Sequence, residues 1–543
     1  MKKFIPIIAL ITLLLSSCEG WLDINTDPNN PSKIKINKVL PIINQDIGAI
    51  MGNGYYDLGY MTSVFTHQLV TREKIDQYGI DGNDMDNIWA SLYVGPLKEV
   101  ENLINNATES DNMVYAGIGK FYKAFLYSQM VDMWGNVPFT EACTPGNFNA
   151  KFDVDKDIYT ACLGLIDQAI ADMTNTESEN LLVPGADDII YAGDTDKWIK
   201  AANSLKLKLY VQAMNTDLYD QAKVNALLAG DLIGEGEDFS VPYGPSVAPD
   251  DRNPGFVDEY AGGQISSYIS PWFWEIINGK AAHILNGNPD PRVPYYICTQ
   301  LGDGESPENP SEYRDGNFVT IYFGSVGVNS DHAGRNTFAM IGLYPVGGAY
   351  DSADLDKSLG LGVSAGTGAA PFRMLTAADV LYLKAELAAK GKIADDAKVI
   401  LQSAVEASFA QVDAVTAVAG MGTEPELVGS DAVNTYIGKV LGEYDASSAE
   451  KKLEIIMTQK WISKFGSSND AYTDYRRTGY PVLFDPNTMG ALATGGPEGS
   501  GQVPVQCTRP YPLSLPWSSD ELSMNDNAPD QKSVGSAPIF WDK

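Results

Sequence analysis

The chain has 543 residues, of which 38 are lysine or arginine and 70 are aspartate or glutamate, so its formal net charge is −32. A chain well above the usual size of one domain can bury a large core, and 44% hydrophobic residues suit an ordered globular protein. The strong negative charge repels phosphate backbones and anionic lipid, so we expect no nucleic-acid partner.

Residues 1–18, MKKFIPIIALITLLLSSC, have the organisation of a secretory signal, with two lysines, an apolar run and then small residues. The apolar run is too short to span a membrane in the mature protein. The last four residues resemble a bacterial lipobox, in which the cysteine thiol is acylated. We therefore predict a signal peptide over residues 1–17 and a lipid anchor at Cys18, which would hold the protein on a membrane. The alternative is an ordinary signal peptide followed by an unrelated cysteine.

Residues 18–36 are rich in asparagine and proline and are expected to form a lipidated tether. Within it, Asp23, Asn25 and Asp27 imitate the start of a calcium-binding loop. Pro28 stands where that loop needs glycine, and no glutamate stands at its twelfth position, so we expect no EF-hand. With so many carboxylates a structural calcium ion stays open, but the sequence assigns it no ligands, and no other cofactor is expected.

Apolar residues recur at helical spacing in ten segments of the chain. The first two predicted helices cover residues 38–50 and 58–70. The other eight form four antiparallel pairs: 88–106 with 114–134, 157–173 with 195–214, 377–390 with 395–410, and 432–441 with 448–465. Four such hairpins, each of about forty residues, are typical of tetratricopeptide-like repeats.

Individual residues predict where these helices bend, begin and pack closely. Pro96 is expected to kink the helix over 88–106 or to mark a late start. On the helix over 114–134, Gly117 and Gly119 would let a second helix approach closely. Asp196 is the predicted N-cap of the helix over 195–214.

Two other regions have few helical periods. Residues 230–371 are dense in glycine, proline, asparagine, serine and tyrosine, so they predict a loop-rich region with short strands, a texture that often carries function. The tail over 485–543 is similar and ends in aromatic residues that we expect to pack against the body. The predicted fold is therefore mainly α. One domain over 37–543 would combine helical repeats at about 86–214 and 375–466 with the loop-rich region and the irregular tail.

The chain carries little that indicates catalysis. His67, His283 and His332 are scattered and make no metal-binding pair, so a zinc hydrolase is not expected. The serine motif over 362–366 lies in a flexible glycine-alanine run without the strand and helix that a nucleophile elbow needs. A pair of glycosidase carboxylates among the 70 acids is an open alternative. The remaining cysteines show no CxxC spacing, which leaves their disulfide state open; they are Cys143, Cys162, Cys298 and Cys507.

Aromatic residues in the loop-rich region indicate binding instead. A sugar ring offers C–H groups on its face and hydroxyls on its rim, so a flat exposed aromatic suits it. Trp272 and Trp274 lie in the segment SPWFW, with Tyr268 just before it, and Tyr78 stands in a charged loop over 72–87. We predict that these four residues bind ligand, with Trp272 or Trp274 and Tyr78 forming a stacking platform. The alternative is a hydrophobic staple that holds the loop down.

Seven segments, taken together and in order, resemble the SusD/RagB-like outer-membrane lipoproteins. They are WGNVPF (134–139), DKWIKAANSLKLKLY (196–210), DPRVPYY (290–296), FRMLTAADVLYLKAELAAKG (372–391), QKWISKFG (459–466), DYRRTGYPVL (474–483) and RPYPLSLPWSSDELSMN (509–525). The resemblance implies a cell-surface protein, lipid-anchored in the outer membrane, with a tetratricopeptide half and an irregular half. It also implies a capture lid that passes oligosaccharides to a SusC-like TonB-dependent transporter. Glu19 and Asp23 resemble the acidic export signal of surface lipoproteins in the Bacteroidetes.

Most residues of these segments have structural interpretations. Tryptophans at helical spacing are expected to pack helices together rather than to touch ligand, as is Tyr480; they are Trp134, Trp198 and Trp461. The arginines are expected to pair with carboxylates or backbone carbonyls inside the body, and they are Arg292, Arg373, Arg476 and Arg477. The sequence thus predicts a glycan-binding lipoprotein without catalytic residues. The alternatives are a lid for peptides or other nutrients and a glycoside hydrolase, and the identity of the glycan stays open.

Overall fold

A computed structural model describes residues 35–71, 74–261, 267–307, 311–327, 337–342, 368–419, 426–486, 488, 492–496, 501–507 and 509–542. The predicted signal peptide, the anchor at Cys18, most of the tether, His332 and the 362–366 serine motif lie outside these residues.

Helices dominate the described part of the chain. They are α2 (Ile36–Met51), α3 (Leu58–Phe65), α4 (Gly82–Leu92), α5 (Lys98–Glu109), α6 (Met113–Trp134), α7 (Asp155–Met173), α8 (Thr195–Gln212), α9 (Gln221–Leu228), α10 (Pro254–Phe256), α11 (Pro271–Ile277), α12 (Val293–Tyr296), α14 (Ala377–Ala389), α15 (Ala397–Ala419), α16 (Asp431–Asp445), α17 (Ala449–Ser463), α18 (Asn469–Thr478) and α19 (Ser519–Met524).

The strands are short and pair two by two, always antiparallel. The pairs are β1 (Leu69–Thr71) with β5 (Ser267–Ile269), β2 (Val137–Pro138) with β3 (Phe152–Asp153), β4 (Phe239–Val241) with β10 (Phe372–Leu375), β6 (Ile297–Cys298) with β9 (Met340–Ile341), β7 (Tyr313–Asp315) with β8 (Phe318–Thr320), and β11 (Leu492–Thr494) with β12 (Gln502–Pro504).

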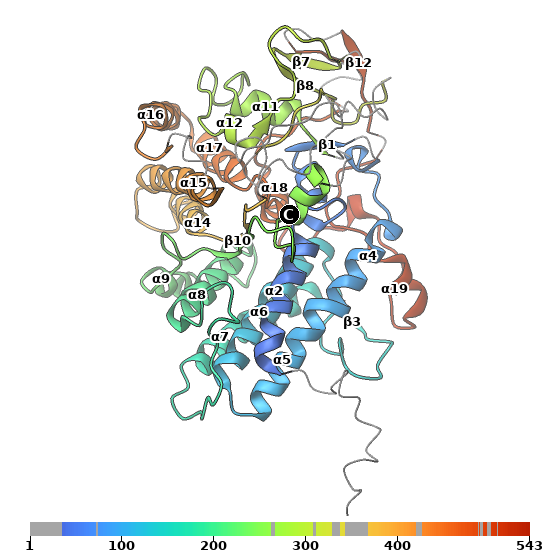
Figure 1. Cartoon of the computed structure of the whole chain (residues 1–543), viewed down its shortest axis with the longest axis vertical. Coiled ribbons are helices and arrows are strands. Elements are labelled where there is room, and N and C mark those ends of the chain that lie inside the picture. Colours follow the sequence, from blue (N-terminus) through green and yellow to red (C-terminus); the bar gives the residue numbers. More distant parts are fainter. Residues whose placement is uncertain are drawn as a thin grey trace, which may run out of the picture.

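The helices form hairpins as predicted. Helix α5 packs on α6, α7 on α8, α14 on α15 and α16 on α17, and α6 also packs along α7. In Figure 1 the hairpins of α5–α8 fill the lower part of the molecule, while α11, α12, β7, β8 and β12 lie at the upper end. The mainly helical fold with a loop-rich part is confirmed.

Helix α6 lies at the centre of the first repeats and is buried along almost its whole length. A Cβ atom on Gly117 would lie 2.6 Å from Met173 Cγ and 2.7 Å from the Ala169 carbonyl oxygen, both on α7. A Cβ atom on Gly119 would lie 2.8 Å from Ile104 Cγ1 on α5. The small residues therefore let two helices, rather than one, approach α6 closely.

Several predicted boundaries were wrong. Helix α3 ends at Phe65, because residues 69–71 pair with residues 267–269 as strands β1 and β5. Helix α15 runs on to Ala419. The N-cap of α8 is Asp194 rather than Asp196, since the Asp194 side chain accepts the Lys197 N–H.

The helix predicted over residues 88–106 is broken near Pro96, so the predicted kink is confirmed. A π-helical segment over Tyr93–Leu97 separates α4 from α5, and Gly95 within it has non-helical backbone angles. Because proline donates no backbone hydrogen bond and its ring clashes with the preceding turn, a regular helix cannot pass through this point.

Helix α18 was not predicted. Its sequence, NDAYTDYRRT, is polar and shows no apolar stripe, yet eight of its ten residues are buried. The tail packs on the body near this helix, as expected: Trp541 is buried, and the Leu515 N–H donates to the Met133 carbonyl oxygen.

Within the described ranges, no helix has both the length and the apolar character that a membrane span requires. Cys143, Cys162, Cys298 and Cys507 are free thiols. The same ranges hold no group of three or more histidine, cysteine or acidic side chains arranged to hold a metal ion.

Candidate functional site

Three of the four predicted ligand-binding residues lie inside the protein. Tyr268 on β5 is fully buried with its ring against Phe338, and Tyr78 is only 6% exposed. Trp274 is 8% exposed, its ring stacks on Phe318 with the centroids 4.1 Å apart, and its indole N–H donates to Asp315. The expectation that Trp274 and Tyr78 form an exposed stacking platform was wrong, because both rings fill the core under the loops, as the Tyr268 ring also does.

Trp272 is the partly exposed member of the predicted set. Helix α11 starts with Pro271, and the Ser270 side chain accepts the Trp272 N–H as the N-cap. Side chains two residues apart on a helix point to nearly opposite sides, so Trp274 turns inward while Trp272 turns outward. The Trp272 indole N–H donates to the Val482 carbonyl oxygen over 2.8 Å, which fixes the ring.

Trp272 lines a hollow of about 200 Å³, which we name the Trp272 pocket. Its walls come from α11, the segment after β8, the chain after α18, and β11. They are made by Ser270, Pro271, Trp272, Glu275, Tyr322, Phe323, Phe484, Leu492, Ala493 and Thr494. Aromatic rings thus lie beside hydroxyl and carboxylate groups, the combination that suits the apolar face and polar rim of a sugar.

Tyr78 packs behind Phe323, one of the residues that line the Trp272 pocket. Its ring lies 5.3 Å from that of Phe323, and its hydroxyl lies 3.0 Å from His67 Nε2. The His67 ring also stacks on Phe323, with the centroids 3.8 Å apart. Burial lowers the pKa of His67 to about 3, so its imidazole is neutral at physiological pH. Tyr78 therefore belongs to the support of the pocket rather than to its surface.

The carboxylate of Glu275 is the acidic group among the residues that line the Trp272 pocket. It accepts a hydrogen bond from the Tyr313 hydroxyl, and burial raises its pKa. Glycoside hydrolysis needs two carboxyl groups that flank the scissile bond. Among the described residues, the lining of this pocket supplies one.

A second, larger hollow of about 750 Å³ lies between α14, α15 and the loop over 230–238. Alanines make much of its wall, and its acidic groups are Asp231, Glu235, Asp238 and Glu406. No aromatic ring is present among its lining residues. The described lining of this α14–α15 hollow therefore offers no flat ring that would hold a sugar by its face.

The four predicted structural arginines are confirmed in that role. Arg292 binds Asp290 through two contacts, Nε–Oδ1 at 3.0 Å and Nη2–Oδ2 at 2.6 Å. Arg373 donates to the carbonyl oxygens of residues 463 and 465, and Arg476 to those of residues 132 and 513. Arg477 pairs with Glu386 and Asp474.

The aromatic residues that were expected to pack helices together divide into two groups. Trp134, Trp198 and Trp461 are buried, while Tyr480 is only partly buried.

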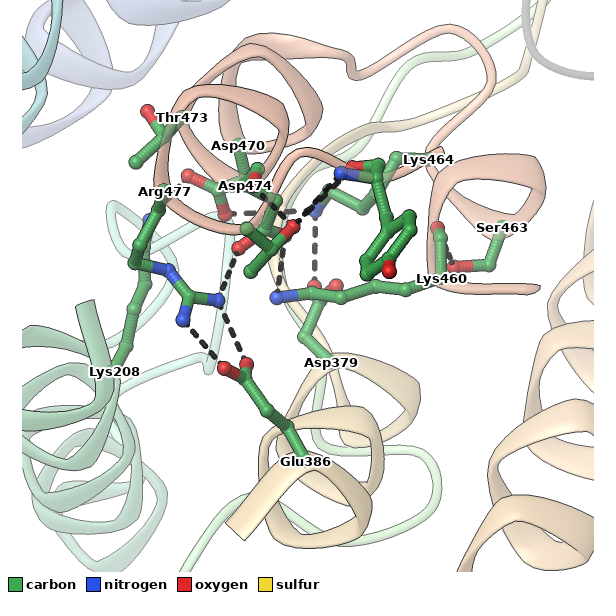
Figure 2. A network of polar contacts seen from close by, with 12 residues as sticks. Lys208, Asp379, Glu386, Lys460, Ser463, Lys464, Asp470, Thr473, Asp474 and Arg477 are labelled. Carbon is green, nitrogen blue, oxygen red and sulfur yellow. Dashed lines mark hydrogen bonds and ion pairs between the residues drawn. The ribbon is translucent and has the colours of Figure 1, made fainter. Parts of the chain in front are cut away.

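Arg477 belongs to a buried network that holds α18 against three other helices (Figure 2). Its buried members are four positive and four negative side chains: Lys208, Lys460, Lys464 and Arg477 with Asp379, Glu386, Asp470 and Asp474. The partly exposed Lys390 also pairs with Glu386. Asp470 shows the effect of this pairing. Burial alone would raise the pKa of its carboxyl, but Lys208 and Lys464 outweigh burial and hold that pKa well below its usual range.

This network matters for the pocket because the chain runs from α18 directly into the pocket wall. Residues 480–484 continue from α18, and they supply the Val482 carbonyl that binds Trp272 and the Phe484 ring that lines the pocket. The sequence prediction missed Phe484, Tyr322 and Phe323. Tertiary structure alone assembles their segments, so no local pattern marks them.

Comparison with known proteins identifies the family. A family model described as "Starch-binding associating with outer membrane", of the SusD-like type, matches residues 28–497. No curated protein matches the sequence.

Solved structures match over nearly the whole chain. One is a SusD/RagB family protein from Bacteroides thetaiotaomicron, with 19% identity, a TM-score of 0.68, and coverage of 94% of this chain and 99% of that one. Another is described as a chitin-binding protein, with 18% identity, a TM-score of 0.67, and coverage of 94% and 100%.

A third is a chitin-binding SusD homolog from Flavobacterium johnsoniae, with 18% identity, a TM-score of 0.65, and coverage of 94% and 98%. At these identities the structures establish the fold, and the family model, which spans most of the chain, establishes the membership. The chain belongs to the SusD-like family of outer-membrane nutrient-binding proteins.

Proposed function

We propose that this protein is a non-enzymatic capture protein for glycans, anchored by a lipid at Cys18 to the cell surface. It would hand oligosaccharides to a SusC-like TonB-dependent transporter in the outer membrane. Family membership supports nutrient binding at the outer membrane, and two similar structures are described as chitin-binding. Anchoring beside a transporter raises the local concentration of ligand, so modest affinity suffices.

The observation that carries the glycan proposal is the partly exposed Trp272 ring in a pocket with polar groups at its edge. The ring is fixed by its hydrogen bond to residue 482 and by its stacking on His283, so little side-chain entropy is lost when a ligand packs on it. The Glu275 carboxylate and the Thr494 hydroxyl can accept hydrogen bonds from sugar hydroxyls.

The experiment is isothermal titration calorimetry of the wild type and Trp272→Ala against a panel of soluble fragments of chitin, starch, xylan and galactomannan. We expect Trp272→Ala to lose at least about tenfold in affinity, as truncation of a central aromatic contact does. Phe148→Ala is the matched control, because Phe148 is an aromatic side chain that is 86% exposed and does not line the pocket. Unchanged affinity in the Trp272 variant would remove this site from the proposal.

Absence of catalysis is tested by analysing the products after long incubation of the protein with the same polysaccharides. We expect chains of unchanged length. Shortened chains in the wild type, restored to full length by Glu275→Gln, would instead establish a hydrolase at the pocket.

The anchor is tested by cell fractionation. Cys18→Ala should move the protein from the membrane fraction to the soluble fraction, because the acyl chains supply the membrane affinity. Retention of the variant in the membrane fraction would contradict lipidation at Cys18. In the same cells, the wild type should co-purify with a TonB-dependent transporter.

One observation favours a second cargo. The α14–α15 hollow is lined by four carboxylates and by Lys384 as its cationic side chain, so a cationic peptide would complement it. Lysine-rich peptides therefore belong in the panel. Binding of these peptides that is lost in Glu406→Gln, with no glycan bound, would favour the peptide alternative.

A further inference from the structure

A third hollow lies on the other side of Trp272. It has a volume of about 390 Å³ and lies between the segment after α11 and helix α16. Its lining consists of Ala282, His283, Ile284, Asn286, Gly287, Asn288, Lys439 and Glu443. We name it the Lys439 pocket.

The two pockets share one wall. The ring of Trp272, which lines the first pocket, stacks on the ring of His283, which lines the second. The ring centroids are 5.3 Å apart and the planes differ by 18°. His283 is exposed, so the stack reaches the protein surface between the two hollows.

The segment that carries His283 is held in place by the body. The Lys451 ammonium donates to the His283 carbonyl oxygen over 2.6 Å, and the Asn288 amide donates to the Tyr436 carbonyl oxygen over 3.1 Å. The Gly287 N–H donates to the Gly279 carbonyl oxygen, which closes the loop on itself. A wall fixed in this way is preorganised to bind.

Polar groups of the Lys439 pocket keep hydrogen-bonding capacity. The Lys439 ammonium donates one bond to the Gly287 carbonyl oxygen at 2.8 Å, and an ammonium has three N–H groups. The Glu443 carboxylate accepts the Leu285 N–H through Oε2 at 3.0 Å, and a carboxylate has about four acceptor sites. Donors and acceptors thus lie beside an aromatic ring, as they do in the Trp272 pocket.

We infer that the Trp272 and Lys439 pockets are two parts of one groove for a linear glycan of several sugar units, with the Trp272–His283 stack as the wall that the chain crosses. This inference rests on the proposed glycan-binding function. The Trp272 pocket, at about 200 Å³, is smaller than the ~300–1,000 Å³ of usual ligand sites, while the neighbouring Lys439 pocket, at about 390 Å³, lies within that range, as the two do together. A ligand that contacts both hollows has to cross the Trp272–His283 stack, so the ligand class is a chain of sugars rather than a single sugar.

The test is affinity against chain length. Oligomers from dimer to hexamer are prepared from whichever polysaccharide of the panel binds best, and are titrated into the wild type, His283→Ala, Lys439→Ala and Trp272→Ala. Lys223→Ala on α9 is the matched control, because Lys223 is an exposed lysine on another helix. Urea unfolding of each variant verifies that it is folded.

We expect wild-type affinity to rise from dimer to hexamer. Lys439→Ala should weaken hexamer binding about fivefold and leave dimer binding unchanged. His283→Ala should weaken hexamer binding more than dimer binding, because it removes a contact with the chain and also loosens the Trp272 ring, and Trp272→Ala should weaken both. The groove inference is overturned by wild-type affinity that does not rise with length, or by hexamer binding unchanged in both Lys439-pocket variants while Trp272→Ala still weakens it. In those cases the proposed function stands. No binding by the wild type to any polysaccharide of the panel, or full affinity of Trp272→Ala for dimer and hexamer, would overturn the proposed glycan site and the groove together.

Discussion

Arg477 on α18 and Glu386 on α14 form a two-pronged ion pair, with Nη1–Oε1 at 2.5 Å and Nη2–Oε2 at 2.7 Å, and both side chains are fully buried. Burial alone would raise the pKa of Glu386, but Arg477, Lys390 and Lys460 outweigh burial and lower that pKa to about 2. The carboxylate is therefore ionised at neutral pH, and the pair joins the polar helix α18 to the second set of repeats.

Removing one member of this pair should destabilise the fold strongly. Arg477→Ala leaves the Glu386 charge buried without its main partner, which costs about 3 to 5 kcal/mol in the free energy of unfolding. Lys398→Ala is the matched control, because its ion pair with Asp445 is largely exposed and should contribute less than about 1 kcal/mol. Urea unfolding followed by circular dichroism measures both, and equal losses in the two variants would contradict a structural role for the network.

Asp132 predicts that the stability of the fold depends on pH. This carboxyl on α6 is fully buried and accepts the indole N–H of Trp541, and burial raises its pKa to about 7 despite Lys208 and Arg476 nearby. Below about pH 4 the carboxyl is protonated in both the folded and the unfolded chain. Between about pH 4 and pH 7 the unfolded chain loses this proton and the folded chain keeps it. The contribution of Asp132 to stability therefore falls as pH rises, by about 4 kcal/mol.

Asp132→Asn removes this titration. The difference in unfolding free energy between the variant and the wild type should shift in favour of the variant as pH rises from about 4 to 7. Urea unfolding at intervals of one pH unit measures the shift. A difference that is constant across this range would show that Asp132 has an ordinary pKa in the folded protein.

Gly117 on α6 tests the close approach of α7. Gly117→Ala would place a methyl group against Met173 and the Ala169 carbonyl oxygen, so overpacking should destabilise the protein by about 1 to 3 kcal/mol. Gly164→Ala, on α7, is the matched control: its added methyl group meets no atom within 4 Å, so higher helix propensity should stabilise by about 1 kcal/mol. Thermal unfolding of the two variants should shift in opposite directions. A shift in the same direction would contradict the packing argument.

The helical hairpins could be predicted because each has an apolar stripe that its neighbours must cover. The helices from α5 to α8 and from α14 to α17 follow the periodicity of their apolar residues, and the break at Pro96 follows from the chemistry of proline. Helix α18 could not be found in this way, because what buries it is charge pairing with Lys208, Glu386 and Lys460. Such pairing needs partners from distant segments, and a local window does not contain them.

The same distinction between local pattern and distant contacts applies to the candidate site. The segment SPWFW was recognisable as an aromatic cluster in loop-rich sequence, and Trp272 within it does line a pocket. Which of its rings faces outward depends on the orientation of α11 against β8, where Phe318 covers Trp274. The charged sequence neighbours of Tyr78 predict a position at the surface, yet Phe323 and Tyr511 enclose its ring.

By itself, the sequence determined the family, the helical repeats and the arginines that fasten loops to the body, because these follow from local periodicity and from side-chain chemistry that holds in any context. Only the tertiary structure decided which aromatic rings stay exposed and that Phe484, Tyr322 and Thr494 meet Trp272 in one pocket. The physical reason is that exposure and pocket lining depend on contacts between segments far apart in the sequence. Those contacts form only when the whole chain folds around its common core.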